Sequence, residues 1–163
     1  MSYLNHNDKA TKNQERLFTA ISAGFFLLLI GAIFIITPNL FREIMDFFGD
    51  FTVVNIPNTE IVFLGPEFPR LHLNVYEAMG NASIAFAVFQ LIILALRFVI
   101  PSSWGKRSET AGNMVYWSGA AYLIQLFLIE NSQWFVFWST IIIIVGVSLI
   151  VRAVVMAVSQ IQR

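Results

Sequence analysis

Long apolar stretches separated by polar ones dominate this chain, and they predict four membrane-spanning helices. The apolar stretches cover residues 17–37, 74–100, 111–129 and 134–158. A helix rises about 1.5 Å per residue, so a hydrocarbon layer about 30 Å thick is crossed in about 20 residues. The stretch 17–37 has this length and holds no charged residue. The expected fold is an all-α membrane protein with a single transmembrane domain.

The polar segments set the expected topology. Residues 1–16 form a polar tail, residues 38–73 form one long external cap, and the two remaining links are short. Short links imply antiparallel neighbours, so we predict an up-down four-helix bundle. A cleaved signal peptide is the alternative for residues 17–37. Its apolar region would span about 7–15 residues, which favours a retained first helix.

The first part of the cap predicts a short amphipathic helix. Thr37 suits an N-cap, Pro38 suits the first helical position, and Gly49 suits the end. One face is apolar, and we list it as a candidate interface or docking face: Phe41, Ile44, Met45 and Phe48. This face could lie in the membrane interface, meet a partner or pack on its own bundle, and the last is the more common arrangement.

The second part of the cap predicts a small β-hairpin. The β-prone stretches 51–56 and 60–64 flank the turn residues 57–59. A two-stranded ribbon is marginal by itself in water, so it should rest on the amphipathic helix or on a partner. The pairs Gly65-Pro66 and Phe68-Pro69 predict an irregular return to the membrane.

Small residues recur at intervals of seven within the expected spans. The pairs are Gly24 with Gly31 and Gly112 with Gly119, and residues 139, 146 and 153 continue the pattern in the last span. Such stripes let helices approach closely along a left-handed seam. We therefore expect the bundle to close on itself.

Composition supports a membrane location and excludes some functions. Apolar residues make up 57% and charged residues 12% of the 163 residues, whereas soluble domains are about 25% charged. Cysteine is absent, which excludes disulfides, thiol nucleophiles and thiolate metal sites. The net charge is zero, which argues against nucleic acid as a partner.

The distribution of charge predicts the orientation. With both termini on one side, that side holds eight basic and three acidic residues, and the other side holds two basic and seven acidic residues. Basic residues in short flanks favour the cytoplasmic side. We predict a multi-pass cell-membrane protein with cytoplasmic N- and C-termini. Arg97 and Arg152 are expected to reach the headgroups at that side.

Polar residues inside the spans are the candidate functional positions. They are expected in an outer layer and an inner layer, and they comprise Asn81, Gln125, Ser139 and Thr140 (outer) with Gln90 and Tyr116 (inner). Hydrogen bonding between helices is the more common role of such residues, and lining for a small ligand or permeant is the alternative. Glu77 and Glu130 form a candidate acidic rim on the outer side, although solvated helix-end charges are more common.

No pattern predicts catalysis, a cofactor or a bound metal. No ionisable residue is expected at mid-depth, which argues against a proton or ion pump. His72 with Glu67 and Glu77 is the one candidate metal cluster, and it is a weak one because metal sites need closely grouped ligands.

Several runs resemble a group of small four-helix membrane proteins from archaea. They are residues 36–41, 54–59, 109–117 and 134–138. The similarity extends from the first span to Arg152. The resemblance implies the architecture and an archaeal cell membrane, and it implies no activity.

Three functions remain open. The favoured one is a structural or accessory subunit whose external cap docks a partner membrane protein or another copy. An oligomeric channel or small-solute permeation unit is the alternative, supported by the polar layers and the acidic rim. A membrane enzyme using His72 and Glu77 is the least favoured.

Overall fold

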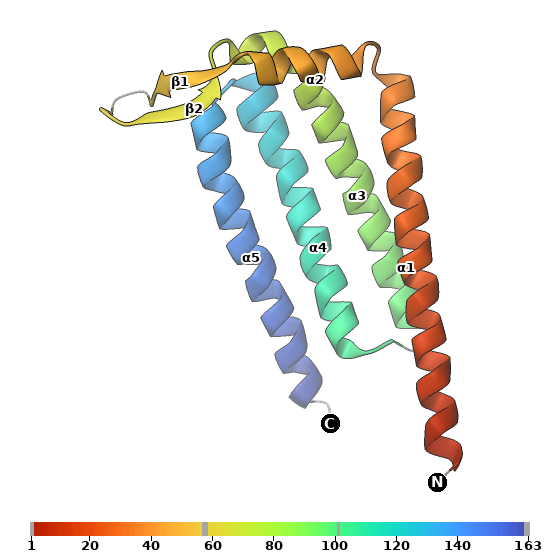
Figure 1. Ribbon diagram of the computed structural model, residues 1–163. Helices are drawn as coiled ribbons and strands as arrows, with labels where there is room; N and C mark the ends of the chain where they lie inside the picture. Colours follow the sequence, from red (N-terminus) through yellow and green to blue (C-terminus); the bar gives the residue numbers. More distant parts are fainter. Residues whose placement is uncertain (1, 57–58, 101, 162–163) are drawn as a thin grey trace.

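Four long helices lie side by side, with a small cap across one end (Figure 1). The computed structural model describes the backbone of residues 2–56, 59–100 and 102–161, and side chains from residue 13 onward within these ranges. The long helices are α1 (Ser2–Ile36), α3 (Leu73–Val99), α4 (Trp104–Leu123) and α5 (Trp134–Ile161). Their directions alternate, so the free ends of α1 and α5 lie at the same end of the molecule.

Three of these helices are long and apolar enough to cross a membrane, which supports the predicted class of protein. The segments are Asn13–Ile36, Pro69–Val99 and Trp134–Ile161. The expected span 111–129 is not among them. The first turns of α4 carry Lys106, Arg107 and Glu109, and α4 gives way to a π-helix, η2 (Ile124–Glu130), in the outer part of that span. Whether α4 crosses the bilayer therefore stays a prediction.

The helices form an open row, which differs from the expected closed bundle. The extensive contacts run between α3 and α4 and between α4 and α5, whereas α1 meets α3 over a much smaller surface. None of the residues in the most apolar window of α1 is buried, compared with 17% of those in the α3 segment. The α1 edge of the row is therefore left uncovered.

Glycine contacts differ between the two edges of the row. A Cβ on Gly112 would come within 2.5 Å of Arg152 Cγ, and one on Gly119 would come within 2.7 Å of Ile144 Cδ1. These two glycines let α5 approach α4 closely, as their spacing predicts. A Cβ on Gly24 or Gly31 would meet nothing within 4 Å. The expectation that the α1 stripe packs within the chain is therefore wrong.

The amphipathic helix of the cap is present, and it begins later than predicted. α2 (Leu40–Gly49) is preceded by Asn39, whose φ of 56° is left-handed, so Thr37 and Pro38 lie outside the helix. Asn39 tolerates this conformation because its short polar side chain is among the few that adopt it. The helix ends at Gly49, as predicted.

The predicted hairpin is also present. Strand β1 (Phe51–Asn55) pairs antiparallel with β2 (Val62–Pro66), and Val53 lies opposite Leu64. The second strand begins two residues later than predicted and includes Gly65 and Pro66, which were expected in an irregular segment. The turn residues 57 and 58 lie outside the described residues. A 3-10 helix, η1 (Pro69–His72), then leads into α3.

The buried core is divided between the two ends of the row. The larger part lies beneath the cap and is built on Tyr76, Leu128 and Trp134, with Phe47 of α2 above them. The smaller part comprises Phe18 of α1 with Phe89 and Ile93 of α3. The cap therefore supplies much of the packing at its own end.

Candidate functional site

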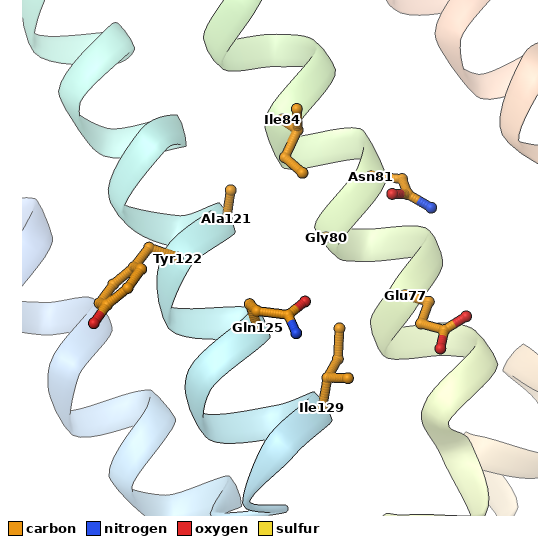
Figure 2. Close-up of a pocket in the computed structure, with 8 residues that line it drawn as sticks. All are labelled: Glu77, Gly80, Asn81, Ile84, Ala121, Tyr122, Gln125 and Ile129. Atoms are coloured by element: carbon orange, nitrogen blue, oxygen red, sulfur yellow. The ribbon is translucent and has the colours of Figure 1, made fainter.

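Two clefts open beside the outer turns of α3, and we treat them together as the candidate site. Glu77 and Asn81 line both clefts, and both side chains are exposed. In Figure 2 these two side chains extend from the side of α3 that is turned away from α4, whereas Gln125 points toward α3. The site therefore gathers three of the polar positions that the sequence singles out.

The first cleft lies between α3 and the outer part of α4 with η2, and it has a volume of about 530 Å³. Gly80 lies at the base of this cleft. Its lack of a side chain leaves room there, because a Cβ at this position would touch Ile124 and Ile129. The remaining lining is mainly apolar, and the eight residues drawn in Figure 2 are Glu77, Gly80, Asn81, Ile84, Ala121, Tyr122, Gln125 and Ile129.

The π-helix shapes one wall of this cleft. Gln125 Nε2 donates a hydrogen bond to Glu130 Oε1 over 3.2 Å. These residues are five apart and would lie on different faces of an α-helix, whereas the wider turn of a π-helix brings them together. The predicted lining residue Gln125 and the predicted rim residue Glu130 are thereby joined. Sequence periodicity, interpreted as α-helical, could not show this contact.

The second cleft lies between the end of α1, α2 and α3, with a volume of about 440 Å³. Its lining includes the carboxylates of Glu43 and Glu77, and Asn74 Nδ2 donates to Glu43 Oε1 over 3.5 Å. No lysine or arginine lines either cleft among the described residues. The two clefts therefore suit a cation or a hydrogen-bond donor and disfavour an anion.

Next to the clefts, the cap is fastened to α3 by a polar contact that the sequence analysis missed. Asp50 Oδ2 accepts hydrogen bonds from His72 Nε2 over 2.9 Å and from the Phe68 amide over 2.8 Å. Burial opposes ionisation of Asp50, but the bonds from Phe68, His72 and the Glu67 amide together lower its pKa. No local spacing signals this pair, because 22 residues separate its members.

Aromatic rings surround this contact. Phe47 lies edge-on to His72, Tyr76 and Trp134, with centroid separations between 5.2 and 5.9 Å. The Tyr76 hydroxyl and the Trp134 indole nitrogen are buried without a hydrogen-bond partner among the described residues. His72 is thus part of a packed structural cluster, and its side chain is 6% exposed.

The other predicted positions lie apart from the clefts. The hydroxyls of Ser139 and Thr140 bond to carbonyls of their own helix. Gln90 lines a separate cleft at the opposite end, and Tyr116 lies against Trp117. The expected outer layer is therefore only partly assembled.

The apolar face of α2, which is predicted as a candidate interface, divides into two stripes. Leu40, Ile44 and Phe47 turn toward the bundle, and Leu40 and Phe47 are buried. Phe41, Met45 and Phe48 form the neighbouring stripe, and each is more than half exposed. Three apolar side chains are therefore uncovered at the outer end of the molecule.

Charged residues at the end opposite the cap form a second polar network. Arg97 is buried, and its Nη1 donates to both oxygens of Glu15 and to Ser102. Arg152 Nη2 donates to Asn113 Oδ1 over 2.6 Å. Both arginines were expected to extend to the headgroups, whereas the structure folds them onto partners between the helices. Glu15 lies 82 residues from Arg97 and Asn113 lies 39 residues from Arg152, so no local spacing predicts these two contacts.

The described residues contain no group of three or more histidine or acidic side chains that could hold a metal ion. His72 is paired with Asp50, whereas Glu77 lines the clefts. Comparison of the chain with protein-family models, curated proteins and solved structures finds no match.

Proposed function

We propose that this chain is an integral membrane protein with four spans, and that it serves as a structural or accessory subunit that docks another membrane protein chain. The observation that carries the proposal is the open α1 edge. A Cβ on Gly24 or Gly31 would meet nothing within 4 Å among the described residues, although glycine within a helix costs about 1 kcal/mol relative to alanine. Small residues in membrane helices are typical of helix–helix contacts, so a second chain accounts for them.

A second uncovered apolar surface lies on α2, which begins four residues after the end of α1. Its stripe consists of Phe41, Met45 and Phe48, and each is more than half exposed. Within the cap, the carboxylate of Asp50 is engaged by His72 and by the Phe68 amide. These features favour a docking role over a catalytic one.

Site-specific photocrosslinking in the native membrane tests this proposal. A photoreactive phenylalanine analogue is placed at Leu28 of α1 or at Phe48 of α2, both of which are exposed. Ile92 of α3 is the matched control, because it is exposed on a helix that has neighbours on both sides. We expect discrete protein adducts at residues 28 and 48 and lipid adducts at residue 92. Lipid adducts at all three positions, with a monomer after gentle solubilisation, would contradict the proposal.

An oligomeric cation channel is the second candidate, favoured by Glu43 and Glu77 in the outer clefts. A single open row encloses no pore, so several copies would have to surround one. Reconstituted liposomes should then show a K⁺ flux that falls in Glu77→Gln and is unchanged in Glu60→Gln, since Glu60 lies on the hairpin segment away from the clefts. Absence of flux in the wild type would remove this candidate.

A further inference from the structure

A polar cleft of about 260 Å³ lies between α1, α3 and α4, at the end of the molecule opposite the cap. It exists because α1 and α4 both pack on α3 and leave a gap between them. Both charged and uncharged polar side chains line the cleft, and they include Ser22, Gln90, Arg97, Lys106, Glu109 and Asn113.

These groups are arranged in order of depth. Arg97 and Lys106 lie near the helix ends, and Gln90 and Asn113 follow seven residues deeper on the same helices, which is about 10 Å. The next turns toward the middle of the row are aromatic. Phe86 lies against Phe25 at 5.8 Å and stacks on Trp117 at 4.6 Å between centroids. The gap thus passes from charged to neutral polar to apolar.

The charges at the mouth leave a small positive excess. Glu15 pairs with Arg97 and Glu109 pairs with Lys106. Beside these two pairs, Arg152 Nη2 donates to the amide oxygen of Asn113 and Arg107 Nε donates to the Arg97 carbonyl, and neither forms an ion pair among the described residues. The described side chains around the mouth therefore carry more positive than negative charge. The hydrogen bond from Lys106 lowers the pKa of Glu109 against the effect of burial, and the charges of Lys106, Arg152 and Arg97 lower it further.

We propose that this cleft binds one anionic glycerophospholipid, with the phosphate at Lys106 and the glycerol ester region at Ser22, Gln90 and Asn113. A phosphodiester carries a negative charge, which is complementary to the positive excess at the mouth. The acyl chains then follow the aromatic surface between α1 and α4. Basic clefts between membrane helices at headgroup depth are typical sites for anionic lipids.

The inference rests on the membrane location proposed above and is independent of docking. Loss of protein crosslinks at residues 28 and 48 would leave the lipid site standing. Equal retention of all lipids would exclude the lipid site and would not affect the proposed docking surface.

Native mass spectrometry of the full chain in nanodiscs tests the site. The probes are phosphatidylglycerol and phosphatidylcholine in equal amounts. The primary variant is Lys106→Gln, because the Lys106 side chain is about half exposed and its loss leaves helix packing intact. Ser22→Leu fills the cleft from α1, and Arg42→Gln at the opposite end is the matched control.

We expect the wild type to retain phosphatidylglycerol over phosphatidylcholine, and Lys106→Gln to lower that preference about fivefold. Ser22→Leu should lower retention of both lipids, and Arg42→Gln should match the wild type. Inorganic phosphate at 10 mM should displace nothing, because it lacks acyl chains. Displacement by phosphate would overturn the assignment to a lipid. Equal retention of the two lipids, or an unchanged preference in Lys106→Gln, would overturn the site.

Discussion

The two ends of the helix row are held together by different forces. At the cap end, Phe47, Tyr76 and Trp134 pack into one continuous aromatic core. At the opposite end the apolar core is small, and the Arg97–Glu15 pair fastens α1 to α3. Phe25 in the middle of α1 also stacks on Phe89 of α3, with 4.0 Å between the ring centroids. The comparison shows that α1 contacts α3 along one face, whereas a Cβ on Gly24 or Gly31 would meet nothing within 4 Å among the described residues.

The largest expected effect comes from the aromatic core. Trp134→Ala should lower the free energy of unfolding by about 3–5 kcal/mol, because it leaves a large cavity among buried rings. Thermal unfolding in detergent micelles measures the change. Trp138→Ala, which removes a ring that is about half exposed, is the control and should cost far less. Similar losses in the two variants would mean that the cap end is not held by this core.

The second expected effect concerns the close approach of α5 to α4. Gly119→Val places side-chain atoms against Ile144, so it should destabilise the protein by about 1–3 kcal/mol. The same substitution at Gly31 meets no neighbour and should leave stability nearly unchanged. Unfolding curves for the two valine variants provide the test. Equal destabilisation would contradict the open position of α1.

A third prediction concerns the Asp50–His72 contact. Asp50→Asn should cost about 1–2 kcal/mol of cap stability, measured by hydrogen exchange of the β1 amides. The pKa of Asp50 is lowered below its ordinary 3.8 in the folded state. The contribution of its charge is therefore present above about pH 3.8 and is lost as the pH falls through the folded pKa. The protection factors of the β1 amides in the wild type should fall below that pH, and those in Asp50→Asn should change less. Parallel pH profiles would exclude the contact as a source of stability.

The smallest expected effect on stability comes from Gly31→Val, which should nevertheless disturb assembly. A bulkier side chain on the uncovered stripe should weaken crosslinking of residue 28 to a protein partner about tenfold, while leaving the unfolding temperature within about 2 °C. Gly146→Val on α5, where a Cβ also meets nothing within 4 Å among the described residues, shows whether the loss of crosslinking is confined to the α1 stripe. If Gly31→Val left the crosslinking unchanged, this stripe would not be part of the docking surface.

Local patterns predicted much of the architecture. The apolar stretches gave the long helices, the alternating directions followed from short links, and the hairpin followed from β-prone runs around Pro57. These features depend on neighbouring residues alone. The start of α2 was misplaced because the left-handed conformation of Asn39 leaves Pro38 outside the helix.

The site was less accessible to prediction. Asn81 and Gln125 were expected at the same depth, and they do line one cleft. The contact between Gln125 and Glu130 depends on an unusual helical turn, the π-helix. The pairing of Arg97 with Glu15 depends on a contact between distant segments. The openness of the row also depends on which stripes find partners. Spacing alone does not decide this, since Gly24–Gly31 and Gly112–Gly119 have the same interval.

A four-span topology places the two ends of α4 on opposite sides of the bilayer, and thiol labelling at these ends decides whether α4 crosses it. The chain has no cysteine, so single substitutions Ser103→Cys and Asn131→Cys give unambiguous sites. A membrane-impermeant thiol reagent applied to intact cells should label residue 131, together with Glu60→Cys in the cap, and should reach residue 103 only after permeabilisation. Labelling of residues 103 and 131 from the same side would contradict the account.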